Sequence, residues 1–195
     1  MTALRWWWVR HAPTGAQGAI GWTDLAADLS DAAALGRLAA ALPYAPVLSS
    51  DLARARTTAE RLAGGRPLAP PDPGLRELHF GDWEGRGFDA IARSHPAESR
   101  AFWEAPGPSR APGGESFDDL AARVAATVAR VNAEMGTGDV IAVAHMGSIM
   151  AALAQAAGLS AAQALRFSIA PLSLTRLDWL PDARAWRVGA VNLTP

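Results

Sequence analysis

Two histidines and two arginines stand where the chain could bind and attack a phosphate group. Arg10 and His11 directly follow a run of bulky apolar residues, and His145 directly follows a second apolar run. Arg54 lies in the first turn of a predicted helix, where free backbone N–H groups and the positive helix pole favour anions. A neutral imidazole nitrogen attacks a phosphate monoester without charge repulsion, and arginine forks fit the phosphate oxygens.

Each of these residues also has a plainer interpretation. A lone histidine is most often a hydrogen-bonded packing residue, and Arg54 could be a solvated arginine beside Arg56 and Arg61 on the same helix. Two observations favour a functional role for His11. It lies in a loop at a strand end, where functional residues concentrate, and the arginine before it is costly to bury unless it meets an anion.

A carboxyl group in the middle of the chain could supply acid–base chemistry. Glu77, Asp82 and Glu84 lie close together in sequence. A carboxylic acid beside a phosphate ester can protonate the leaving oxygen and then take a proton from water. Plain surface charge is the alternative interpretation of all three carboxylates.

These candidates are spread along the chain, so a fold must bring them together. The apolar runs at residues 6–9 and 140–144 predict buried strands, and residues 46–49 predict a third. Strands that alternate with helices predict a three-layer α/β sandwich with a mostly parallel central sheet. Ligands gather at the carboxyl ends of the strands in such sheets. We therefore expect the loops after these three strands to meet at one edge.

The predicted helices have recognisable ends. Ser30 can cap a helix over residues 31–42, and a glycine pair ends a helix over residues 52–63. Ser116 followed by Asp119 is a capping-box pattern for a longer helix. The remaining predicted elements are short helices near residues 88–94 and 97–104, a helix after the second apolar run, and closing strands at residues 173–179 and 186–191.

The composition fits one domain over residues 1–195 and excludes several classes of function. The chain is 50% hydrophobic with a formal net charge of −1, so we expect no general attraction to nucleic acid or to a membrane surface. The absence of cysteine excludes disulfides and thiol catalysis. No apolar run approaches the ~18 residues of a membrane span, and no signal-peptide pattern is found. We expect a cytoplasmic protein, and the oligomeric state is left open.

Five motifs of the chain resemble those of the histidine phosphatase superfamily, which includes cofactor-dependent phosphoglycerate mutase. They span nearly the whole chain in the order that the family has. In this sequence they are Val9-Arg10-His11-Ala12-Pro13-Thr14, the segment of residues 49–59, Leu75-Arg76-Glu77 with residues 80–85, Pro112-Gly113-Gly114-Glu115-Ser116 and Ala144-His145-Met146-Gly147.

The resemblance implies a role for each candidate residue and a phosphoglycerate mutase-like fold. His11 matches the nucleophile that becomes phosphohistidine, and Glu77 matches the proton donor. The implied reaction needs neither cofactor nor metal, takes a small phosphorylated substrate and releases inorganic phosphate. The implied phosphate pocket consists of Arg10, Arg54, His145 and, as a nearby hydroxyl, Thr14.

The chain departs from the family pattern at two positions and resembles its compact phosphatases most. Ala12 and Met146 stand where the family usually has glycine, so we expect an active enzyme with an altered pocket. Residues 88–114 are short and poor in cations, which resembles the compact phosphatases, among them alpha-ribazole phosphatase, and not the mutases. We expect a phosphomonoester hydrolase for a small metabolite, with alpha-ribazole 5′-phosphate or a sugar phosphate as candidate substrates.

Several alternatives stay open at this point. Phosphoglycerate mutase-type phosphoryl transfer and a non-catalytic phosphate-binding protein are the other family-based hypotheses. A metal hydrolase built on His11, His79 and His145 lacks a compact ligand spacing. Nucleotide binding at residues 15–18 matches neither a P-loop nor a dinucleotide fingerprint. Three tryptophans could line an aromatic pocket or belong to the core, namely Trp22, Trp83 and Trp103.

Overall fold

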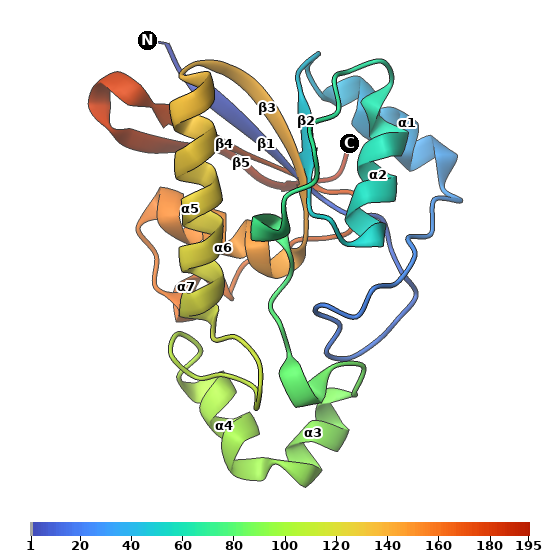
Figure 1. The fold of residues 1–195 in the computed structure, drawn as a ribbon, viewed down its shortest axis with the longest axis vertical. Coiled ribbons are helices and arrows are strands. Elements are labelled where there is room, and N and C mark those ends of the chain that lie inside the picture. The colour runs from blue at the N-terminus through green and yellow to red at the C-terminus, as the bar shows by residue number, and fades with distance from the viewer. Residues whose placement is uncertain (1) are drawn as a thin grey trace.

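The computed structural model describes residues 2–195 and places a five-stranded sheet between two layers of helices (Figure 1). Helices α1 and α2 pack on one face, and α5 and α6 pack on the other. The three-layer α/β prediction is confirmed. In chain order the elements are β1 (Leu4–Arg10), α1 (Ala32–Ala41), β2 (Val47–Ser49), α2 (Ala53–Ala63), α3 (Phe88–Ser94), α4 (Pro96–Glu104), α5 (Phe117–Met135), β3 (Gly138–Ala144), α6 (Met146–Ala157), α7 (Ala161–Ala164), β4 (Leu174–Leu180) and β5 (Ala185–Leu193).

The sheet is mixed, so the prediction of a mostly parallel sheet is wrong. Its strand order is β2-β3-β1-β4-β5. Strand β3 pairs in parallel with β1 and β2, whereas β4 is antiparallel to β1 and β5 is antiparallel to β4. Only the 3₁₀ turn Pro181–Ala183 and Arg184 join the last two strands. Such a short connection excludes the crossover that parallel strands need.

Strand β1 is buried on both faces, as its apolar run predicts. Trp6 and Trp8 stack with their ring centroids 5.1 Å apart in the core that lies under α5 and α6. Val9 points into the other core, under α1 and α2. On that second face the Trp7 indole nitrogen donates to the Asp139 carboxylate at 2.7 Å. The strand is therefore anchored in both hydrophobic layers.

The helix ends follow local capping chemistry. Helix α1 is capped by Asp31, whose carboxylate accepts from the Ala34 backbone N–H at 2.9 Å, so the predicted Ser30 cap is wrong by one residue. Helix α5 begins with the expected capping box between Ser116 and Asp119. Helix α2 ends at Gly64, which adopts the left-handed conformation that glycine tolerates best.

The carboxyl ends of the three parallel strands lie together. Arg10 is paired with Ala144, and Ser49 is paired with Val143. The residues that follow these strands therefore start from the same edge of the sheet. Helices α3 and α4 form a separate group beyond this edge, at the bottom of the view in Figure 1.

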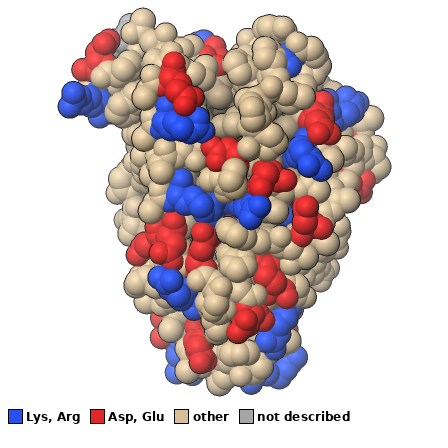
Figure 2. Space-filling model, viewed as in Figure 1, with Lys and Arg blue, Asp and Glu red and all other residues tan. Residues whose placement is uncertain are grey.

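The surface has no segregated charge on the face shown in Figure 2, where acidic and basic side chains are interspersed. This pattern agrees with the formal net charge of −1.

Within residues 2–195, every helix is too short or too polar to traverse a lipid bilayer.

Candidate active site

His11 lies just past the end of β1 with its ring oriented by the backbone. Its own N–H donates to the Ala144 carbonyl at 2.9 Å. The ring Nδ1 lies 2.7 Å from the Ala12 carbonyl oxygen. A carbonyl oxygen only accepts hydrogen bonds, so Nδ1 carries the ring proton. The other nitrogen, Nε2, therefore keeps a free lone pair in the neutral ring.

The surroundings of His11 keep its ring neutral. Burial lowers the pKa of His11 to about 3, and the positive charges of Arg54 and Arg10 act in the same direction. The hydrogen bond to the Ala12 carbonyl opposes this shift only in part. At neutral pH the ring is uncharged, which is the state that a nucleophilic imidazole requires.

Arg54 lies in the first turn of α2, almost completely buried, and its guanidinium is held in a fixed position. It donates to the Gly21 carbonyl at 2.6 Å and to the Thr23 carbonyl at 3.0 Å. Its Nε lies 3.3 Å from Nε2 of His11 and donates to it. The guanidinium therefore lies directly beside the unprotonated nitrogen of His11, whose lone pair accepts this long hydrogen bond.

Thr58, one helical turn after Arg54, joins α2 to the loop that contains His11. Its hydroxyl donates to the Arg54 carbonyl at 2.7 Å and accepts from the Ala12 backbone N–H at 3.0 Å. This single hydroxyl couples the positions of His11 and Arg54.

Arg10 supplies a second guanidinium at the end of β1. One of its terminal nitrogens donates to the Ile169 carbonyl at 2.6 Å. Its Nε is buried and has no hydrogen-bond partner among the described residues. A buried guanidinium with an unpaired donor is well suited to bind an anion.

Glu77 approaches the same place from the segment that precedes α3. Its carboxylate accepts from the backbone N–H groups of Leu78 at 2.9 Å and of Gly147, in the first turn of α6, at 3.0 Å. Burial raises the pKa of Glu77, although these hydrogen bonds and the charges of Arg54 and Arg10 oppose the shift. The carboxyl group therefore retains a proton at a higher pH than an exposed glutamate does.

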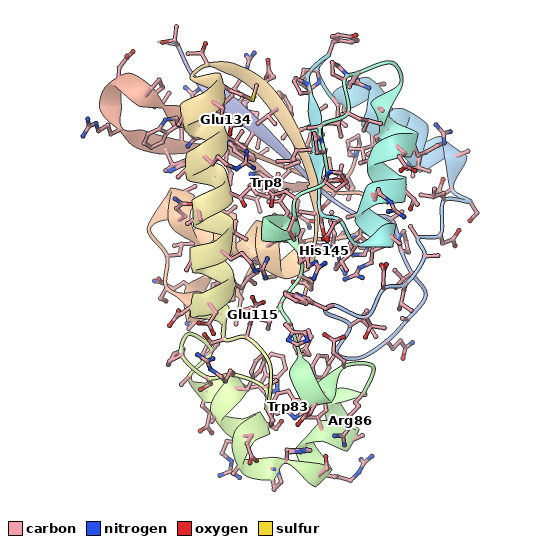
Figure 3. All side chains as sticks on the ribbon, viewed as in Figure 1. Trp8, Trp83, Arg86, Glu115, Glu134 and His145 are labelled. Carbon is pink, nitrogen blue, oxygen red and sulfur yellow. The ribbon has the colours of Figure 1, made fainter. Side chains whose placement is uncertain are left out.

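His145 is fully buried at the start of α6, near the centre of the view in Figure 3. Its ring centroid lies 5.0 Å from that of His11, and the two rings meet edge to face. Burial and the neighbouring His11 hold the pKa of His145 well below its usual value. Neither ring nitrogen has a hydrogen-bond partner among the described residues.

A cavity of about 270 Å³ opens onto this cluster. Arg10, His11, Arg54 and Glu77 form its inner end, and Thr14 also lines it. The Thr14 hydroxyl accepts only a long hydrogen bond of 3.4 Å from the Ala16 N–H. His145 is not among the residues that line the cavity, and its ring contacts the ring of His11. The structure thus brings all six predicted site residues to one edge of the sheet.

Of the three tryptophans, one lines the cavity. Trp103, on α4, is 55% exposed and forms part of the cavity wall. Trp83 is a core residue of the α3–α4 group (Figure 3). Trp22 lies under the Arg76 guanidinium at 4.5 Å and donates to the Glu77 carbonyl at 2.8 Å. Trp22 therefore helps to position Glu77 from outside the cavity.

The two departures from glycine have different structural consequences. Ala12 is buried, and its backbone does not adopt the positive φ that would require glycine. Met146 reaches the cavity and is 39% exposed. Of the two residues, only Met146 changes the chemical character of the pocket.

Glu84 is a supporting residue whose role the sequence pattern did not separate from surface charge. Its carboxylate accepts from the backbone N–H groups of Gly21, Trp22 and Thr23 at 2.8–3.1 Å and from the Thr23 hydroxyl at 2.6 Å. The same segment offers the carbonyls that hold Arg54. No local sequence signal reveals this link, because it joins residues far apart in the chain.

The histidines do not form a metal-binding group. The His79 ring packs on Trp22 with centroids 4.6 Å apart, and His11 and His145 contact each other. Among residues 2–195, no three histidine, aspartate or glutamate side chains converge as metal ligands would.

The chain matches the model of the histidine phosphatase superfamily, branch 1, over residues 6–194. It is 30% identical over 174 residues to the adenosylcobalamin/alpha-ribazole phosphatase of Salmonella typhimurium. The matched region covers 85% of this chain and 86% of that protein.

Two solved structures are similar along almost the whole chain. The mycobacterial glucosyl-3-phosphoglycerate phosphatase is 30% identical with a TM-score of 0.82, over 98% of this chain and 99% of that one. The alpha-ribazole phosphatase from Shigella flexneri has a TM-score of 0.85 over 97% of this chain and 96% of that one. At 23% identity, this second similarity shows the fold alone.

Proposed function

Since the chain belongs to the histidine phosphatase superfamily, we propose that it hydrolyses phosphate monoesters through a phosphohistidine intermediate on His11. The observation that carries this proposal is the orientation of the His11 ring. Its Nδ1 proton is donated to the Ala12 carbonyl, and its unprotonated Nε2 faces the Arg54 guanidinium, from which it accepts a long hydrogen bond of 3.3 Å, where both residues line the cavity.

In the first step, the Nε2 lone pair of His11 forms a bond to phosphorus as the ester P–O bond breaks. Protonated Glu77 donates its proton to the leaving alkoxide oxygen, so a neutral alcohol departs. Arg10 and Arg54 hold the phosphoryl oxygens and balance their charge. The ring of His145 packs against the His11 ring and supports it when it is phosphorylated. Thr14 offers a hydroxyl at the cavity wall.

In the second step, water attacks the phosphorus and the P–N bond breaks. The Glu77 carboxylate takes a proton from the water, and the bonding pair returns to Nε2 of His11. Inorganic phosphate leaves, and both residues regain their starting protonation states. The alcohol released in the first step is a small metabolite, with alpha-ribazole 5′-phosphate and sugar phosphates as candidate substrates on the strength of the relatives.

The test is trapping of the phosphoenzyme. Quenching with an alkaline denaturant during turnover of ³²P-labelled monoester should leave label on the protein. That label should be stable to base and be lost on later acid treatment, as a phosphoramidate is. His11→Ala should lose the label and the turnover, whereas Tyr44→Ala, at a remote exposed position, should keep both. Turnover near the wild-type rate in His11→Ala would show that His11 is not the nucleophile.

A further inference from the structure

The cavity has an apolar outer part that the phosphate chemistry does not use. One side is an aromatic wall, formed by Phe80, Phe88, Phe102 and Trp103. A second, aliphatic wall is formed by Met146, Met150 and Leu165. A phosphate held by Arg10 and Arg54 therefore places the ester oxygen and its substituent in the part of the cavity that these two walls line.

The aromatic wall is held together by ring-to-ring packing. Phe88 and Trp103 meet edge to face with centroids 5.6 Å apart, and Trp103 meets Phe102 at 5.3 Å. Phe80 packs on Phe88 at 6.3 Å. Rings that brace one another in this way present a preformed surface for a flat apolar group.

Four wall residues are large apolar side chains left open to solvent. Trp103 is 55% exposed, Phe88 and Met146 are each 39% exposed, and Leu165 is 37% exposed. They converge on one cavity mouth and are not scattered over the surface. Converging exposed apolar residues mark a binding surface, and continuity with the phosphate site identifies the occupant as the rest of the substrate.

The walls offer no partner for a second charge. Among the described residues that line the cavity, the ionisable side chains are Arg10, His11, Arg54 and Glu77, all at the inner end. Both guanidiniums are already committed to backbone carbonyls and to the phosphoryl group. A carboxylate on the leaving group would lie unpaired against aromatic and aliphatic side chains, which is strongly unfavourable.

We propose that the substrate is the phosphate monoester of an uncharged, ring-bearing apolar alcohol, whose ring system lies against the aromatic and aliphatic walls. This inference rests on the proposed phosphatase function and sets the class of leaving group. It excludes phosphoglycerate-type substrates, in which a carboxylate lies next to the ester, and it removes the polar sugar phosphates from the candidate substrates given above.

The first experiment compares primary-alcohol phosphates, so that intrinsic leaving-group reactivity is similar. The set is 2-(1-naphthyl)ethyl phosphate, ethyl phosphate, glycerol 3-phosphate and 3-phosphoglycerate. We expect kcat/KM to be about 100-fold higher for the naphthylethyl ester than for ethyl phosphate, because a buried bicyclic ring contributes a large apolar area. We expect 3-phosphoglycerate to be the poorest of the four.

The second experiment changes the wall. Trp103→Ala should reduce the ratio of kcat/KM for naphthylethyl to ethyl phosphate about tenfold. Tyr44→Ala, which removes an exposed ring far from the cavity, is the matched control and should leave the ratio unchanged. Leu165→Ser tests the aliphatic wall and should lower the same ratio.

The outcomes separate the inference from the function on which it rests. If the protein hydrolysed neither the four esters nor any aryl phosphate, the phosphatase function itself would be overturned. Hydrolysis of 3-phosphoglycerate or glycerol 3-phosphate as efficiently as the naphthylethyl ester would overturn the apolar leaving group alone. An unchanged ratio in both wall variants would show that the ring binds elsewhere.

Discussion

At the scale of single residues, one physical cause accounts for the protonation states of both His11 and Glu77. Burial disfavours the charged form of any group, so it lowers the pKa of His11 to about 3 and raises the pKa of Glu77. The same desolvated cavity therefore favours the neutral imidazole of His11 and the protonated carboxyl group of Glu77. Those are the states that a nucleophile and a general acid need.

These pKa shifts predict a bell-shaped pH dependence of kcat/KM. Activity should rise through about pH 3 as His11 loses its proton, and it should fall as Glu77 loses its proton above the normal glutamate range. Glu77→Gln should remove the alkaline limb and reduce kcat by ~10²–10⁴. The measurement is a pH–rate profile of both proteins with one phosphomonoester.

The control for this prediction is Asp82→Asn, a carboxylate of the same segment that does not line the cavity. It should leave the profile and kcat unchanged. If Glu77→Gln kept the alkaline limb, another group would be the acid. If it weakened phosphate binding as much as it slowed turnover, Glu77 would be a binding residue and not the proton donor.

The residues of the inner site were predictable from the sequence. Of the cavity walls, only Trp103 was named as a candidate, beside Trp22 and Trp83, which do not line the cavity. Arg10, His11 and His145 stand next to recognisable apolar runs, so their common sheet edge followed from strand ends. The choice of Nε2 as the free nitrogen depends on one carbonyl contact with Ala12. The walls depend on contacts among α3, α4 and α6, which no short motif records.

At the scale of elements, residues 21–23 form a strap that determines where Arg54 points. The Glu84 carboxylate accepts hydrogen bonds from the backbone N–H groups of all three strap residues, and the carbonyls of Gly21 and Thr23 accept from the Arg54 guanidinium. Burial acts to raise the pKa of Glu84, but hydrogen bonds from Thr23, Trp22 and Phe80 outweigh it and hold that pKa below its usual value. The carboxylate is thus charged while it holds the strap.

Glu84→Gln tests this positioning role. An amide has one acceptor oxygen, so at least one N–H of the strap is left unpaired and Arg54 loses its fixed orientation. We expect the Kd for vanadate to rise about tenfold and the stability to fall by about 1–3 kcal/mol. Isothermal titration and chemical denaturation measure the two effects.

Glu60→Gln, on the exposed side of α2, is the control and should change neither quantity. A loss of stability with unaltered vanadate binding would show that Glu84 only supports the fold. The conservative variant Glu84→Asp should restore part of the affinity, since it keeps a carboxylate within reach of some strap donors.

Local patterns predicted most helices and strands but not their pairing. The Ser116 capping box and the Gly64 end were legible because capping depends on neighbouring residues. The direction of β4 relative to β1 depends on the path through α6 and α7, which no local pattern encodes. The mixed sheet therefore emerged only from the structure.

At the scale of the whole molecule, the buried histidines link stability to pH. The folded-state pKa of His11 and of His145 is lowered, whereas the unfolded chain takes up their protons near the ordinary value of 6.5. The stability that they contribute is present above that pH and is lost as the pH falls toward 3. Glu77, whose pKa is raised, acts in the opposite direction.

Comparison with a variant that lacks His11 separates the contribution of this histidine to the pH dependence of the free energy of unfolding from the contribution of Glu77. Between pH 7 and pH 5, one histidine that stays neutral when folded lowers the free energy of unfolding by about 2 kcal/mol. His11→Asn should therefore show a decrease about 2 kcal/mol smaller than the wild type does over this interval. Urea denaturation at the two pH values measures it. An equal decrease in both proteins would contradict the lowered pKa of His11.

The Thr58 hydroxyl, bonded on one side to the loop of His11 and on the other to the helix of Arg54, has a mechanical consequence. The nucleophile and the guanidinium that binds the anion are thereby tied to each other, although they come from different elements of the chain. We expect motion of the cavity rim to change their separation little. Warming should therefore inactivate the enzyme only when the surrounding scaffold melts as a unit.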